Sequence, residues 1–202
     1  MGKNKLIKNV TFLGYADAKE ADDPFRAAYE VARLCALEGF TVINGGGPGV
    51  MKASTMGAKS VGGRAIGVTF FPKDIPMFEG RDPTNKVDEL IVVDTYLERT
   101  LKLLELGHVN IIFNGGTGTI SEFGMAWGLA RLYFGHHKPL VLYGDFWQEI
   151  IFAFTKGMYI RPEERKVFRI VNSPSETIAA IEEFESKANE TSHDHDRTVF
   201  SI

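Results

Sequence analysis

Short runs of β-branched and aromatic residues alternate along the chain with longer stretches in which apolar residues recur at helical spacing. The short runs lie at 10–14, 40–45, 65–70, 89–94, 109–115, 139–144 and 168–171. This alternation predicts parallel strands joined by crossover helices. Several of the runs are apolar without a break, as expected for strands that are covered on both faces. The pattern therefore predicts an α/β fold, a doubly wound parallel sheet of about seven strands with helices on both faces.

Local signals mark where the intervening helices begin and end. After the first strand, the sequence offers Asp22 or Asp23 as an N-cap, Pro24 at the first helical position and Gly39 as a stop. A similar helix is predicted over 95–106, where a glycine again follows the last apolar position. The helices therefore have well-defined ends on sequence grounds alone.

The chain is expected to form a single domain over residues 1–190, with the last helix near 174–188. The polar segment 191–202 is expected to be a flexible tail. The irregular stretch at 72–88 is too long for an ordinary connector, and it is interpreted either as a loop over a site or as a tolerated insertion.

The amino-acid composition and net charge disfavour several classes of binding partner. With 202 residues, 44% hydrophobic and 24% charged, the chain fits one compact domain. A net charge of −3 and a pI near 6.0 disfavour a nucleic-acid partner. No uncharged stretch reaches the ~18 residues of a membrane helix, so no membrane partner is expected.

Cys35 is the only cysteine and is expected to be a buried apolar residue in a cytoplasmic protein. His193 and His195 have no further ligands nearby, so no metal is expected.

Two glycine-rich loops follow predicted strands, whereas the usual place of a dinucleotide fingerprint, after the first strand, holds only one glycine. Both loops begin Asn-Gly-Gly and lead directly into a helix, whose first N–H groups can bind an anion. The alternative is a tight strand-to-helix turn without a ligand. The candidate binding residues are Gly14, then Gly45, Gly46, Gly47 and Gly49 in the first glycine loop (44–49), and Gly115, Gly116, Thr117, Gly118 and Thr119 in the second glycine loop (114–119).

The second glycine loop is the better candidate for phosphate binding, because Thr117 and Thr119 add hydroxyl donors to its backbone amides. No lysine follows its glycines, which excludes a Walker A loop. A monophosphate or a single nucleotide is the ligand that this loop indicates.

Two charged residues near the same predicted sheet edge have competing interpretations. Thr119 and Glu122 have the spacing of a capping box, which gives Glu122 a purely structural role. Arg99 is expected in the first turn of its helix, where a cation opposes the helix dipole and requires a nearby anion, unless it extends into solvent. If Arg99 and Glu122 face one another, the pair is suited to cleavage of a glycosidic bond.

The run GGTGTISE (115–122), together with YLERT (96–100) and NGGGPGVMKASTMGA (44–58), resembles the LOG family of nucleoside 5'-monophosphate phosphoribohydrolases. These proteins are related to the cytokinin-activating enzyme and are often mislabelled lysine decarboxylases. The resemblance covers roughly residues 9–160. It implies a Rossmann-like fold, a homodimer and hydrolysis of a nucleotide to free base and ribose 5-phosphate, with Arg99 and Glu122 as the catalytic pair.

Three positions depart from the family pattern: Thr100 replaces a lysine, Asn114 a proline, and Tyr15 a serine. These changes remove ligand contacts and leave open a second function, that of a non-catalytic carrier of a nucleotide or phosphorylated cofactor, as in the molybdenum-cofactor carrier relatives. Nothing marks a pyridoxal phosphate site, and no cofactor is expected. The helix over 120–134 is apolar almost all round, which favours either a homodimer or a deeply internal helix.

Overall fold

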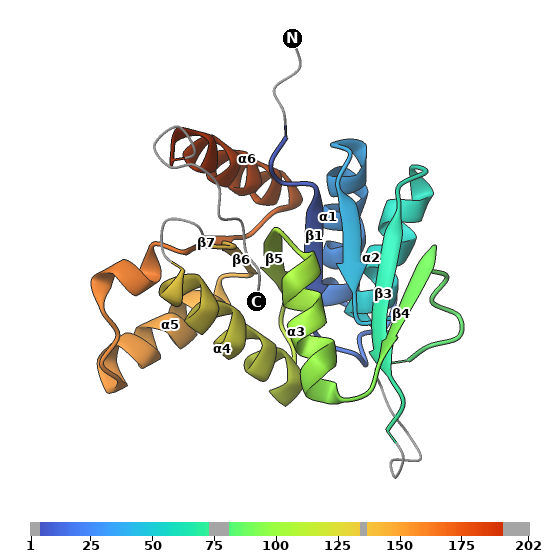
Figure 1. Ribbon diagram of the computed structural model, residues 1–202, viewed down its shortest axis with the longest axis horizontal. Coiled ribbons are helices and arrows are strands. Elements are labelled where there is room, and N and C mark those ends of the chain that lie inside the picture. The colour runs from blue at the N-terminus through green and yellow to red at the C-terminus, as the bar shows by residue number, and fades with distance from the viewer. Residues whose placement is uncertain (1–4, 73–80, 134–136, 192–202) are drawn as a thin grey trace.

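The computed structural model describes residues 5–72, 81–133 and 137–191. Strands and helices alternate along this part of the chain (Figure 1). The strands are β1 (Asn9–Leu13), β2 (Thr41–Asn44), β3 (Ala65–Phe70), β4 (Glu89–Val93), β5 (Val109–Ile112), β6 (Leu140–Tyr143) and β7 (Phe168–Val171). The helices are α1 (Asp23–Leu37), α2 (Val50–Ser60), α3 (Tyr96–Leu106), α4 (Thr117–Leu132), α5 (Phe146–Gly157) and α6 (Pro174–Thr191), with a short 3-10 helix at Pro162–Arg165. Each predicted strand is therefore confirmed, with small differences at its ends.

All seven strands of the described sheet are parallel, in the order β4-β3-β2-β1-β5-β6-β7. β1 lies at the centre because it pairs with β2 on one side and with β5 on the other. The chain first builds outward from β1 to β4 and then crosses back through α3 to β5. This reversal creates a topological switch point between β1 and β5, the usual place for a ligand in such sheets.

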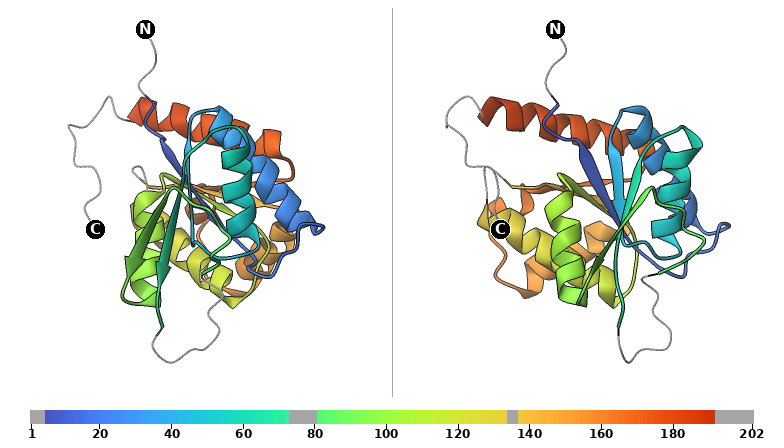
Figure 2. Two further views of the ribbon diagram at one scale, coloured as in Figure 1. Left: turned by 90° about the vertical axis from the view of Figure 1, so that its right-hand side faces the viewer. Right: turned by 45° about the vertical axis from the view of Figure 1, so that its right-hand side comes forward.

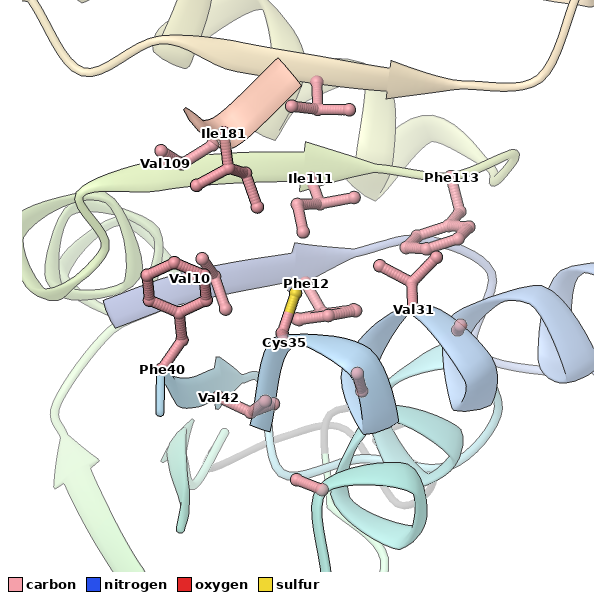
Figure 3. Close-up of a cluster of buried hydrophobic side chains, with 14 of the residues drawn as sticks. Val10, Phe12, Val31, Cys35, Phe40, Val42, Val109, Ile111, Phe113 and Ile181 are labelled. Carbon is pink, nitrogen blue, oxygen red and sulfur yellow. The ribbon is translucent and has the colours of Figure 1, made fainter. Parts of the chain in front are cut away.

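Helices cover both faces of the sheet, which confirms the doubly wound, Rossmann-like arrangement. Figure 2 shows α1, α2 and α6 on one side and α3, α4 and α5 on the other. The first group encloses a core that includes Phe12, Phe113 and Ile181 (Figure 3). Cys35 belongs to this core and is fully buried, and burial raises the pKa of its thiol. The cysteine is thus a buried apolar residue, as expected.

The capping signals in the sequence correspond to the observed ends of α1 and to the observed start of α3. Asp22 is the N-cap residue of α1, followed by Pro24 in the first turn, and Gly39 adopts a positive φ of 84° beyond its end. At α3, Thr95 Oγ1 accepts a hydrogen bond from the Glu98 amide at 3.1 Å, and the Glu98 carboxylate accepts one from the Thr95 amide. This capping box places the α3 start where the sequence predicted it.

α4 differs from the sequence prediction in its start and in its burial. It begins at Thr117 rather than near residue 120. It is also not deeply internal, since Phe123 and Ala126 are buried while Ile120 and Leu132 are 59% and 76% exposed. One side of this apolar helix therefore packs on the sheet and the other side faces outward.

Part of the long 72–88 segment packs against the first glycine loop. The Asp82 amide donates to the Gly46 carbonyl at 3.1 Å, and Asn85 Nδ2 donates to the Gly47 carbonyl at 2.8 Å. Residues 73–80, the middle of the predicted loop over a site, lie outside the described residues. The expected tail beyond α6, with His193 and His195, also lies outside them. Within the described chain, no helix combines the length and apolar character needed to cross a membrane.

Candidate functional site

The loops that follow β1, β2 and β5 meet at the switch point of the sheet. The Tyr15 amide donates to the Asn114 carbonyl at 3.0 Å, which joins the loop after β1 to the second glycine loop. The Val50 amide donates to the Tyr15 carbonyl at 3.0 Å, which joins the same loop to the start of α2. The sequence places these segments far apart, and the sheet order brings them to one edge.

A cavity opens between these loops and the first turns of α3 and α4. Its volume is about 200 Å³, below the ~300–1,000 Å³ typical of pockets that enclose a drug-sized ligand. Of the residues singled out from the sequence, the cavity is lined by Gly14, Gly45, Arg99, Gly116, Thr117, Gly118, Thr119 and Glu122. The lining residues that were not singled out for binding are Phe12, Leu13, Tyr15, Ala16, Met51 and Tyr96. Gly46, Gly47, Gly49 and Gly115 are not among the lining residues.

The second glycine loop presents an open helix N-terminus to this cavity. Gly116 is the N-cap residue of α4, and the amides of a first helical turn have no acceptors within the helix. A Cβ atom added to Gly116 would meet nothing within 4 Å, and one added to Gly118 would meet only Tyr96 Oη at 3.6 Å. Space beside unpaired amides at the positive end of a helix dipole is suited to an anion such as phosphate.

The first glycine loop is packed against protein atoms instead. A Cβ atom on Gly45 would lie 1.7 Å from Arg99 Nη2, and one on Gly49, whose φ is 62°, would lie 2.3 Å from the Tyr15 carbonyl oxygen. The Gly46 amide donates to Asn44 Oδ1 at 2.8 Å. Only Gly45 of this loop reaches the cavity, so these glycines mainly allow close packing of the chain.

Arg99 and Glu122 face one another at the bottom of the cavity. Arg99 Nη1 donates to Glu122 Oε1 at 3.3 Å, and the two residues are only 5% and 7% exposed. The same guanidinium donates through Nε to the Val68 carbonyl at 3.0 Å and through Nη2 to the Gly45 carbonyl at 3.3 Å. Arg99 is therefore held by three separate segments and does not extend into solvent.

Burial raises the pKa of the Glu122 carboxyl, and the Arg99 guanidinium offsets only part of that rise. A carboxyl with a raised pKa can exchange a proton more readily near neutral pH than an exposed one. The arrangement thus combines a helix N-terminus suited to an anion with a buried group able to take up or release a proton.

The capping box expected for Glu122 does not form. α4 already begins at Thr117, so Thr119 lies inside the first turn and Glu122 in the second turn, beyond reach of the helix start. Thr119 instead packs against Gly115, where an added Cβ would lie 2.2 Å from Thr119 Oγ1. Glu122 therefore has no capping role, and its carboxylate accepts a hydrogen bond from Arg99 instead.

A second cavity, of only about 30 Å³, lies between α3 and α4 and is lined mostly by apolar side chains. Lys138 at its edge donates to the Leu104 carbonyl at 2.9 Å. The larger cavity is the better candidate site because it contains the helix N-terminus and the buried ion pair. Within the residues that the structure describes, no group of three or more His, Cys, Asp or Glu side chains is arranged to hold a metal ion.

Comparisons with known proteins identify a family that this chain resembles over most of its length. A family model described as the SLOG cluster4 family matches residues 7–164. The cytokinin riboside 5'-monophosphate phosphoribohydrolase of Mycobacterium tuberculosis is 32% identical over 161 residues, which cover 76% of this chain and 82% of that protein. An uncharacterized protein of Archaeoglobus fulgidus is 33% identical over 133 residues, or 65% of this chain and 83% of that protein.

Among solved structures, the molybdenum cofactor binding protein of the phototrophic bacterium Rippkaea orientalis is similar to this chain with a TM-score of 0.64. The two sequences are 26% identical, and the match covers 91% of this chain and 99% of that one. The relatives thus include both a hydrolase and a binding protein.

Proposed function

The chain belongs to the SLOG cluster4 family, and we propose that it hydrolyses the N-glycosidic bond of a nucleoside 5'-monophosphate, releasing free base and ribose 5-phosphate. The resemblance to the LOG family is confirmed by its relatives, one of which is named a phosphoribohydrolase. The observation that carries the proposal is the buried Arg99–Glu122 pair, which opens into the same cavity as the N-terminus of α4.

The first step of the proposed reaction is capture of the 5'-phosphate. The amides of Thr117, Gly118 and Thr119 and the two threonine hydroxyls supply hydrogen-bond donors at the positive end of the α4 dipole. A phosphate fixed there leaves the sugar over the deeper part of the cavity, toward Glu122. The phosphate thus serves to orient the glycosidic carbon.

Bond cleavage then depends on Glu122. As the C–N bond lengthens, positive charge develops on the sugar, and an ionised carboxylate stabilises it. The carboxylate also takes a proton from the attacking water, whose oxygen bonds to the anomeric carbon, and Glu122 then passes that proton to the departing base nitrogen. Arg99 holds the carboxylate in place through Nη1.

The direct test is to incubate the pure protein with a panel of nucleoside 5'-monophosphates and to measure free base by chromatography. The matched nucleosides, which lack the phosphate, should be poor substrates. Glu122→Gln should reduce release at least ~100-fold, as expected for loss of an essential proton-transfer group. Glu149→Gln, at an exposed position of α5, is the control and should be fully active. Intact turnover in Glu122→Gln would refute the assignment.

The second candidate function is a non-catalytic carrier of a nucleotide or phosphorylated cofactor. It is favoured by the similarity to the molybdenum cofactor binding protein of Rippkaea orientalis and by Thr100, Asn114 and Tyr15, which depart from the hydrolase pattern. Tight binding of a nucleotide without release of base from any member of the panel would support this function over hydrolysis.

We further propose that the protein is a cytoplasmic homodimer that pairs through the outer face of α4. Ile120, Gly124, Gly128 and Leu132 recur every four residues and are exposed, and such an apolar stripe is typical of a protein interface. Leu132→Lys should therefore shift the mass measured by light scattering from dimer to monomer. Leu37→Lys, at a similarly exposed leucine of α1, should leave the mass unchanged. A monomeric wild-type protein would refute the pairing.

A further inference from the structure

A second side-chain link connects α3 and α4 beside the Arg99–Glu122 pair. Tyr96 Oη and Ser121 Oγ lie 3.0 Å apart. Tyr96 is three residues before Arg99 on α3, and Ser121 precedes Glu122 on α4, so the two links run side by side between the helix starts. The Arg99–Glu122 link is buried, whereas Tyr96 is 39% exposed and lines the cavity.

The hydrogens of this link have a defined direction. Ser121 Oγ donates its single hydrogen to the Gly118 carbonyl at 2.9 Å. Because a serine hydroxyl has only one hydrogen, Ser121 Oγ must accept from Tyr96, which uses the one hydrogen of the phenol. The lone pairs of Tyr96 Oη are then left as acceptors, and the tyrosine has no hydrogen to offer a ligand.

The tyrosine ring is also fixed in position. It packs edge-on against Phe70, with ring centroids 6.1 Å apart. Its oxygen lies 3.6 Å from the place that a Cβ atom on Gly118 would occupy, next to the anion-binding end of α4. The site thus holds a preoriented acceptor beside the N-terminus of α4, bonded to the residue that precedes Glu122 in the sequence.

An acceptor at this place cannot serve a phosphate, whose oxygens are themselves acceptors. It fits a hydroxyl group instead. In the proposed reaction the phosphate lies on the α4 N-terminus and the anomeric carbon at Glu122, so the sugar lies beside Tyr96. The 2'-hydroxyl is bonded to the carbon next to the anomeric carbon and is the sugar donor nearest to Glu122.

We propose that Tyr96 Oη accepts a hydrogen bond from the sugar 2'-hydroxyl and thereby selects ribonucleotides over 2'-deoxyribonucleotides. The ligand class in this inference rests on the proposed function. The discrimination itself rests on the Tyr96–Ser121–Gly118 chain of hydrogen bonds. Loss of one hydrogen bond to a buried or partly buried partner reduces affinity by about tenfold.

The test compares binding of AMP and 2'-deoxy-AMP by calorimetry in a Glu122→Gln background, in which hydrolysis does not interfere. The Tyr96-containing protein should bind AMP about tenfold more tightly than 2'-deoxy-AMP. Adding Tyr96→Phe should weaken AMP binding to the level of 2'-deoxy-AMP and leave 2'-deoxy-AMP binding unchanged. Ser121→Ala should reduce the preference as well, because the tyrosine hydrogen is then free to point toward the ligand. Tyr159→Phe, at a fully exposed tyrosine, is the control.

The outcomes separate this inference from the proposed hydrolysis. Binding with the expected AMP preference but no release of base by the wild-type protein would refute hydrolysis alone. An unchanged ratio of the two affinities in Tyr96→Phe, or equal affinities before that substitution, would refute the role of Tyr96 even if the wild-type protein hydrolyses AMP. Absence of binding to AMP and to every other nucleoside 5'-monophosphate of the panel would refute both.

Discussion

The two glycine loops begin with the same three residues and lead into helices at the same edge of the sheet, yet their glycines have different surroundings. In the first loop, Gly45 and Gly49 leave space for other parts of the protein, the Arg99 guanidinium and the loop after β1. In the second loop, Gly116 and Gly118 leave space that no protein atom fills closely. A glycine-rich turn therefore indicates that other atoms come close to its backbone. Whether these atoms belong to the protein or to a ligand depends on the segments that surround the turn in the folded chain.

The largest effect is expected from Gly45→Ala. The new Cβ atom would lie 1.7 Å from Arg99 Nη2 and 2.6 Å from Met51 Sδ, so the guanidinium must move and Glu122 loses its partner. Release of base should fall by roughly 100-fold, the usual consequence of misplacing a catalytic group by about 1 Å. Steady-state kinetics measure this loss. The control is Gly157→Ala, where a Cβ meets nothing within 4 Å; full activity in Gly45→Ala would show that the first loop does not position Arg99.

Gly49→Ala should mainly reduce stability. This residue has a φ of 62°, and its Cβ atom would lie 2.3 Å from the Tyr15 carbonyl oxygen. Backbone strain and the clash should each lower the free energy of unfolding by about 1–3 kcal/mol, which urea denaturation measures. Gly39→Ala separates the two causes, because Gly39 has a φ of 84° and no neighbour within 4 Å. Equal losses in the two variants would mean that close packing adds nothing at the first loop.

Gly116→Ala should weaken ligand binding more than it lowers stability, whereas Gly49→Ala should mainly lower stability. A Cβ atom on Gly116 meets nothing within 4 Å and φ is −92°, so the free energy of unfolding should fall by no more than about 1 kcal/mol, the usual cost of alanine at an N-cap. The methyl group would occupy the space assigned to phosphate, and KM for AMP should rise by roughly tenfold, with a smaller change in kcat. A normal KM would contradict ligand binding by the second loop.

The smallest effect is a pH dependence at Glu122, which lies between the two loops. Since burial raises its pKa, the acid limb of kcat should lie above the ordinary glutamate pKa of about 4.3. The protonated carboxyl favours the folded state, a contribution that is complete below the unfolded pKa and is lost as pH rises through the folded pKa. Between pH 5 and pH 8 the wild-type protein should therefore lose stability relative to Glu122→Gln. A constant difference in urea denaturation across this range would contradict the raised pKa.

The sequence predicted the sheet and the ends of α1 and α3, because these follow from local patterns. It mispredicted the start of α4, since Thr-x-x-Glu spacing fits a capping box but does not determine where a helix begins. It also could not show that Tyr96 and Met51 line the cavity. A signal for Tyr96 was available, because the first residue of a helix after a parallel strand lies at the carboxyl edge of the sheet.

Local sequence patterns were enough to predict an α/β protein with a candidate anion-binding loop and two candidate charged residues. The folded chain was needed to show that Arg99 and Glu122 meet at 3.3 Å and that the Gly45 carbonyl of the first loop accepts a hydrogen bond from the arginine. The physical reason is that periodicity and glycine content act over a few neighbouring residues. Contact between α3 and α4, by contrast, depends on how the strands are ordered in the sheet, and each helix contributes one half of a pair that neither can complete alone.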